Sequence, residues 1–100
     1  MTLPNNDWHT ESIDELIDVM ITLDEPETAA AFLRDLCTVR ELEDMAQRWQ
    51  VVKLLDAGHH YRDVSQRTGA STATITRINQ WLQHGLGGYK WMLEHTNGAS

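Results

Sequence analysis

The feature that most constrains the fold of this chain is a glycine, Gly69, between two short segments of helical spacing. Residues 61–68 precede it, and a second helical pattern begins at residue 72 after a three-residue turn. Two short helices joined by such a turn form a helix-turn-helix. With Gly69 in the turn, suitable small or apolar residues fill the positions where the helices must pack together: Val64, Ser65, Ile75 and Ile78. The sequence therefore predicts a helix-turn-helix over residues 61–83.

The same register places small and polar side chains on the outer face of the second helix. They lie in its N-terminal half, which meets base edges in the major groove when such a motif binds DNA. Hydroxyls can donate to phosphates or bases, methyl groups contact thymine, and arginine can bind guanine through two hydrogen bonds. The predicted DNA-reading residues are Ser71 (also the expected helix N-cap), Thr72, Ala73, Thr76 and Arg77. Arg62, Arg67 and Lys53 are predicted to contact the DNA backbone.

Spacing alone leaves a second interpretation of this segment open. An ordinary corner between two helices, with a threonine-rich face turned to solvent, would have the same pattern.

Helical periodicity continues through the rest of the chain, and no segment alternates in the manner of a strand. Ser12 is expected to cap the first helix, and Pro26 is expected in the first turn of the second. Thr38 and Glu41 form a capping box before a long third helix, which Gly58 should end. The "GLGG" segment then separates the fifth helix from a short last one. The prediction is an all-α fold of six helices.

Length and composition indicate one domain with flexible ends. A chain of 100 residues, 41% of them hydrophobic, is near the most common domain size. Residues 1–11 are polar and are predicted to form a flexible arm, residues 12–95 a single helical domain, and residues 96–100 a flexible tail. A domain this small buries only about two-thirds of its unfolded surface, so a partner subunit would stabilise it.

Charge is distributed unevenly along the chain. The net charge is −7, which by itself argues against a nucleic-acid partner. Residues 1–47, however, hold 12 acidic and 2 basic side chains, a balance of −10. Residues 48–100 hold 3 acidic and 6 basic side chains, a balance of +3. A polyanion such as DNA is therefore expected to bind the second half of the chain.

No pattern typical of catalysis, metal binding or membrane insertion is present. The spacing supports no Ser-His-Asp arrangement, and the neighbouring acidic residues lie on exposed helical faces. His59 and His60 would point about 100° apart on a helix, and no cysteine or carboxylate completes a ligand set with His84. No apolar run approaches the ~20 residues of a membrane span. The first twelve residues hold no basic region followed by an apolar run, so we expect no signal peptide. We expect a cytoplasmic protein that is not an enzyme and has no metal site.

The stretch "TVRELEDMAQRWQVVKLLDAG…YRDVSQRTGASTATITRINQWL…GGY" resembles the Trp repressor superfamily, and within it the bacterial branch of YerC/YecD-type Trp-repressor-related proteins. The resemblance covers roughly Leu23 to Leu93, and "TGASTATITR" is its most specific part. It implies that two chains interlock as an all-α homodimer, with paired helices entering successive major grooves of a near-palindromic operator. It also implies a transcriptional regulator, specifically a repressor.

The resemblance bears on a tryptophan-like corepressor as well. Two arginines of the Trp repressor flank the bound indole ring, and Arg48 and Arg77 match them. The glycine after the second arginine is Ile78 here, and the serine three positions further on is Trp81. Both replacements add bulk where the ligand would lie and are expected to complete the packing there. No cofactor is therefore predicted; Arg48 should make a structural pair or a phosphate contact.

Two alternative functions follow from the same sequence. The chain could be a helical protein-interaction module whose acidic first half binds a basic partner, with a vestigial helix-turn-helix. It could also be a DNA-binding regulator controlled by a small-molecule effector between Arg48 and Arg77.

Overall fold

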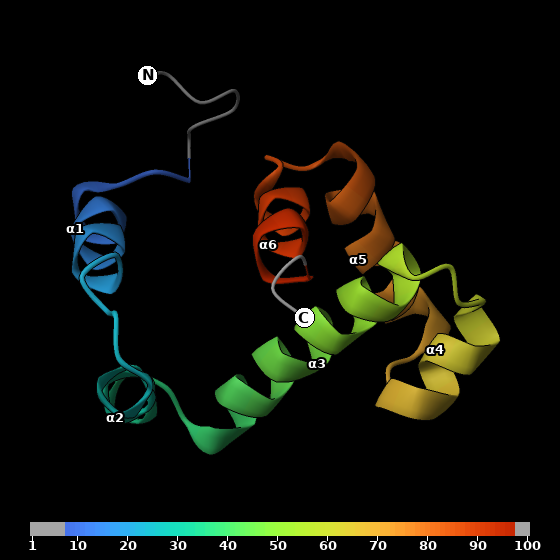
Figure 1. The fold of residues 1–100 in the computed structure, drawn as a ribbon, viewed down its shortest axis with the longest axis horizontal. Coiled ribbons are helices and arrows are strands. Elements are labelled where there is room, and N and C mark those ends of the chain that lie inside the picture. The colour runs from blue at the N-terminus through green and yellow to red at the C-terminus, as the bar shows by residue number, and fades with distance from the viewer. Residues whose placement is uncertain (1–7, 98–100) are drawn as a thin grey trace. The chain divides into compact units, whose positions relative to one another are not determined.

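The computed structural model describes residues 8–97, which form six α-helices and no strand. The helices are α1 (Glu11–Met20), α2 (Pro26–Leu36), α3 (Val39–Asp56), α4 (Tyr61–Thr68), α5 (Thr72–His84) and α6 (Gly88–Asn97) (Figure 1). The all-α prediction of six helices is confirmed. The predicted flexible ends fall largely on residues 1–7 and 98–100, which lie outside the described residues. None of the helices within residues 8–97 combines the length and apolarity that a membrane span requires.

The chain divides into two compact units, a first unit of Met1–Leu42 and a second unit of Glu43–Ser100. In the first unit, α1 begins at Glu11 with Thr10 as its N-cap, and the Thr10 hydroxyl accepts a hydrogen bond from the Ile13 amide at 3.1 Å. The prediction that Ser12 caps this helix is wrong. Capping from Thr10 places Glu11 in the first turn, where its negative charge interacts favourably with the positive end of the helix dipole.

Neither helix of the first unit contains a buried residue. The apolar side of α1 comprises Ile13, Leu16, Ile17 and Met20, of which the first two are half-buried and the others exposed. Ile21, directly after the helix, is 75% exposed. The first unit therefore has amphipathic helices but no core of its own.

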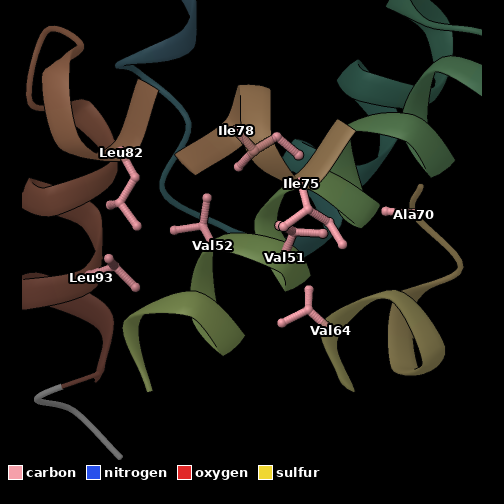
Figure 2. Packing of buried hydrophobic residues seen from close by; sticks show 8 residues of the cluster. All are labelled: Val51, Val52, Val64, Ala70, Ile75, Ile78, Leu82 and Leu93. Carbon is pink, nitrogen blue, oxygen red and sulfur yellow. The ribbon is translucent and has the colours of Figure 1, made fainter. Parts of the chain in front are cut away.

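The core of the described chain lies entirely in the second unit. Its buried residues come from α3, α4, α5, α6 and the α4–α5 turn, and Figure 2 shows their side chains directed toward one another: Val51, Val52, Val64, Ala70, Ile75, Ile78, Leu82 and Leu93. Trp49, Leu54, Leu55, Tyr61 and Tyr89 pack around them, half-buried. Two adjacent residues of α3, Val51 and Val52, are both fully buried, so the C-terminal half of α3 is covered on more than one side.

Both ends of α3 carry the signals that the sequence predicts. At its start, the Thr38 amide donates to Glu41 Oε1 at 2.8 Å and the Glu41 amide donates to Thr38 Oγ1 at 3.1 Å, a complete capping box. At its end, Gly58 adopts a φ of 91°. The Gly58 amide donates to the Leu55 carbonyl and the His59 amide to the Leu54 carbonyl, at 3.0 and 3.1 Å, which is a Schellman motif.

The capping box predicts a pH-dependent contribution to stability. Hydrogen bonds from the Thr38 amide and hydroxyl lower the pKa of Glu41. A carboxylate with a lowered folded-state pKa stabilises the fold above its unfolded pKa, about 4.3, and this contribution disappears as pH falls through the folded value. We expect Glu41→Gln to lower the urea midpoint at pH 7 and to approach the wild type once pH falls below the lowered folded-state pKa of Glu41.

Far-UV circular dichroism at constant protein concentration measures this difference. Glu43→Gln, on the same helix, is the matched control and should show no comparable pH-dependent difference. A loss for Glu41→Gln that is equal at neutral and acidic pH would contradict the assignment.

Candidate nucleic-acid interface

Helices α4 and α5 form the predicted helix-turn-helix, with α5 one residue longer than expected. Gly69 ends α4 in the left-handed conformation at φ 80°, and its amide donates to the Ser65 carbonyl at 2.9 Å. Ser71 caps α5, because its hydroxyl accepts from the Thr74 amide at 3.2 Å. The left-handed turn residue allows the chain to leave α4 and enter α5 within three residues.

The four predicted packing positions are confirmed. Val64 and Ile75 are fully buried, and Ile78 is 1% exposed. Ser65 is half-buried, and its hydroxyl donates to the Ala70 carbonyl at 2.7 Å. These contacts determine which side of α5 faces the core and which side faces solvent.

Further hydrogen bonds around the turn were not predicted from the sequence. The Thr68 hydroxyl donates to the Val64 carbonyl at 2.8 Å and accepts from the Ala70 amide at 3.1 Å. The Gln47 side chain, from α3, donates to the Thr68 carbonyl at 3.0 Å. Gln47 thus ties α3 to the end of α4. No local signal identifies such a contact, because the partners are 21 positions apart.

All five predicted reading residues are exposed and lie at the start of α5: Ser71, Thr72, Ala73, Thr76 and Arg77. Ala73, Thr76 and Arg77 share one face, since they are spaced three and four positions apart. The Ser71 hydroxyl is occupied by its capping role and also donates to Thr74 Oγ1 at 3.0 Å. The exposed face therefore offers methyl groups, hydroxyls and a guanidinium beside an N-capped helix end.

The predicted backbone-contact residues Arg62, Arg67 and Lys53 are exposed as well. Arg67 differs from the other two because its Nε donates to both Asp63 carboxylate oxygens at 3.1 Å. The His59 ring, through Nδ1, lies 2.6 Å from Asp63 Oδ2. The hydrogen bond with His59, followed by that with Arg67, lowers the pKa of Asp63. Asp63 therefore stays ionised at neutral pH and offsets the charge of Arg67. This pair was not predicted from the sequence, although its i, i+4 spacing signals it.

Ile78 and Trp81, the two residues expected to add bulk where a corepressor would lie, differ in their exposure. Ile78 belongs to the core, as expected. Trp81 is 48% exposed, so the expectation that it completes the packing is wrong for this single chain. Trp81 follows Ile78 by three positions, but the buried side of α5 continues through Leu82 instead. Arg48 lies exposed on α3. Within residues 8–97, no three His, Cys, Asp or Glu side chains gather to hold a metal ion.

Comparisons with known proteins agree on one family. The profile of the family described as Trp repressor protein matches residues 11–97. The uncharacterized protein YerC of Bacillus subtilis is 36% identical over 84 residues, which are 84% of this chain and 81% of YerC. The crystal structure of a candidate Trp repressor from Staphylococcus aureus superposes with a TM-score of 0.87 at 38% identity, covering 96% of each chain. A TrpR-like protein from Eubacterium eligens gives 0.87 at 35% identity, covering 93% of this chain and 96% of its own.

Replacing Gly69 should destabilise the fold through the backbone conformation of the turn, and not through a clash with a neighbouring helix. A Cβ added at Gly69 would meet only Gln47 Nε2, at 3.8 Å, which is an ordinary contact. The φ of 80° is nevertheless unfavourable for alanine. Gly69→Ala should therefore destabilise the fold by roughly 1–2 kcal/mol, measured by urea unfolding. Gly69→Asn should cost less, because asparagine tolerates this conformation. Equal losses for both variants would show that φ is not the cause.

Proposed function

Because the chain belongs to the Trp repressor family, we propose that it binds double-stranded DNA sequence-specifically, as a homodimeric helix-turn-helix regulator that represses transcription. We assign the chain no catalytic activity and propose that residues 12–95 form one folded domain. The relatives come from bacteria, where operator DNA lies in the cytoplasm, and the proposed location of this chain is the same.

The main support for DNA binding is the orientation of α5 about its own axis. Ile75 and Ile78 are buried, and this leaves Ala73, Thr76 and Arg77 exposed on the other side of the same helix. The N-terminal half of the second helix is the part of such a motif that contacts base edges. We assign base reading to this half of α5, with Arg77 binding guanine or a phosphate.

Charge supports the proposed orientation of the motif. Arg77, Arg62 and Lys53 form no ion pair within residues 8–97, so their charges are available to phosphates. Arg67 already binds Asp63. We therefore expect Arg67 to contribute less to binding of the DNA phosphates than Arg77, Arg62 and Lys53. The excess of basic residues in the second half of the chain makes this half the side that meets DNA.

The exposed apolar side chains support a homodimer. The first unit exposes Ile17, Val19, Met20, Ile21, Leu36 and Val39, and the second exposes Trp81, Leu86, Trp91 and Met92. This much exposed apolar surface on so short a chain is typical of an interface. The opposite charges of the two halves, −10 and +3, favour contact between the first half of one copy and the second half of another. A symmetric pair would present two reading helices to a near-palindromic operator.

The role of Arg77 is tested by two substitutions. Arg77→Ala should abolish selective binding to the operator while the protein stays folded and dimeric. Arg77→Lys should keep most of the non-specific affinity but lose discrimination, because an ammonium cannot form the paired hydrogen bonds of a guanidinium. A lost bidentate contact corresponds to roughly 1–3 kcal/mol of discrimination. Fluorescence anisotropy with operator and scrambled duplexes, at several salt concentrations, measures both effects.

The same titration separates the proposal from the alternative of a protein-interaction module. DNA binding should weaken steeply as salt rises, since bound phosphates release counterions. Unchanged operator affinity in Arg77→Ala would remove the assignment of this residue. Absence of wild-type DNA binding even at low salt would instead favour the interaction module.

The homodimer is tested by a charge on the apolar side of α1. The wild type should sediment at twice its monomer mass of 11.4 kDa. Ile17→Asp should shift it toward monomer and lower its thermal midpoint, because burying an unpaired carboxylate opposes association. Asp18→Ala changes a neighbouring residue off the apolar side and should leave the mass unchanged. Analytical ultracentrifugation over a concentration series gives the result, and a wild type that stays monomeric would refute the dimer.

A further inference from the structure

We propose that Thr72 and Thr76, two exposed threonines one turn apart on α5, have opposite hydrogen-bonding roles toward DNA. Thr76 accepts a hydrogen bond from the exocyclic amino group of adenine or cytosine in the major groove. Thr72 acts as the donor. This inference rests on the proposed function and adds to it the class of base that one position of α5 recognises.

The first observation is that the Thr76 hydroxyl proton is already used. Thr76 Oγ1 donates to the carbonyl oxygen of Thr72 at 2.9 Å. A threonine hydroxyl has a single proton and two acceptor lone pairs. While this hydrogen bond is kept, the exposed oxygen of Thr76 can only accept.

The second observation is that the other hydroxyls nearby are in different states. Ser71 Oγ donates to Thr74 Oγ1 at 3.0 Å and accepts from the Thr74 amide, so both of its functions serve the helix cap. Thr72, the first residue of α5, is exposed, and its hydroxyl has no hydrogen-bond partner among residues 8–97. Thr72 therefore retains a free donor, whereas Thr76 does not.

The chemistry of DNA then divides the possible contacts. Phosphate oxygens, guanine N7 and O6, and thymine O4 are acceptors, and an acceptor-only oxygen gains nothing from them. The donors in the major groove are adenine N6 and cytosine N4. Thr76 is thus restricted to an amino group, while Thr72 can donate to a phosphate or to an acceptor on a base.

The position of Thr76 suits a base edge better than a distant backbone contact. It lies on the exposed face between Ala73 and Arg77, one turn into the helix. Consecutive residues of a helix rise by only about 1.5 Å, so Thr76 and Arg77 reach the same or a neighbouring base pair. An operator half-site should therefore carry an adenine or cytosine at or beside the base pair that lies nearest to Arg77.

Selection from a random duplex pool, with the wild type and matched variants, tests this assignment. Thr76→Val keeps the shape and methyl group but removes the oxygen, and Thr76→Ser keeps the oxygen but removes the methyl group. We expect Thr76→Val to lose the preference for adenine or cytosine at one position of each half-site, and Thr76→Ser to keep it. Thr72→Val should leave the preference at that position unchanged.

A second measurement identifies the atom that is recognised. Anisotropy titrations compare the selected operator with a duplex in which that base lacks its amino group, purine for adenine or pyrimidinone for cytosine. The wild type should lose affinity by about 2- to 10-fold, the range for one hydrogen bond. Thr76→Val should bind both duplexes equally, and circular dichroism confirms that each variant is folded.

The outcomes separate this inference from the proposed function. If Thr76→Ser loses a thymine preference that Thr76→Val keeps, the methyl group reads the base and the inference is overturned. If neither variant changes the selected sequence, Thr76 is not a reader, although sequence-specific binding stands. If the wild type selects no sequence, the proposed function fails and this inference fails with it.

Discussion

The packing of Ile75 and Ile78 against the valines of α3 and α4 is the interaction on which the rest of the second unit depends. Val51, Val52 and Val64 are fully buried with them (Figure 2). This cluster fixes the rotation of α5 about its axis, and the rotation decides which of its residues are exposed. Gly69 permits the sharp turn that brings α4 and α5 onto the same core, and Gln47 fastens the turn to α3. The exposed face to which we assign base reading is therefore a consequence of apolar packing.

The two units rely on different sources of stability. The second unit has a buried cluster to which four helices contribute, whereas the helices of the first unit bury nothing completely. Local signals nevertheless define α1 and α2, through the Thr10 cap and through Pro26 in the first turn. Isolated helices of this length are marginal in water, so the proposed homodimer would add to the stability of α1 and α2.

Much of this structure could be predicted from the sequence because its determinants are local. Capping residues and turn glycines act within a few positions, as the Thr38–Glu41 box and Gly58 show. Local signals gave the wrong cap for α1, because both Thr10 and Ser12 have a hydroxyl that can cap a helix and only Thr10 does so. Contacts between distant parts of the chain could not be predicted from local patterns. Gln47 and Thr68, for example, are 21 positions apart. The exposure of Trp81 was not predicted either, because it depends on tertiary packing. The candidate interface was predictable as a set of exposed positions, but the states of its hydroxyls were not.

The separation of buried and exposed positions on α5 has a consequence for how this motif can diversify. Thr72, Ala73, Thr76 and Arg77 have exposed side chains, while Ile75, Ile78 and Leu82 hold the helix in place. Substitutions at exposed sites away from special features usually change stability little. New combinations of side chains at these four positions can therefore be sampled without first loosening the fold. Under the proposed function, proteins that share this scaffold and differ at these four positions would bind different operators with the same architecture.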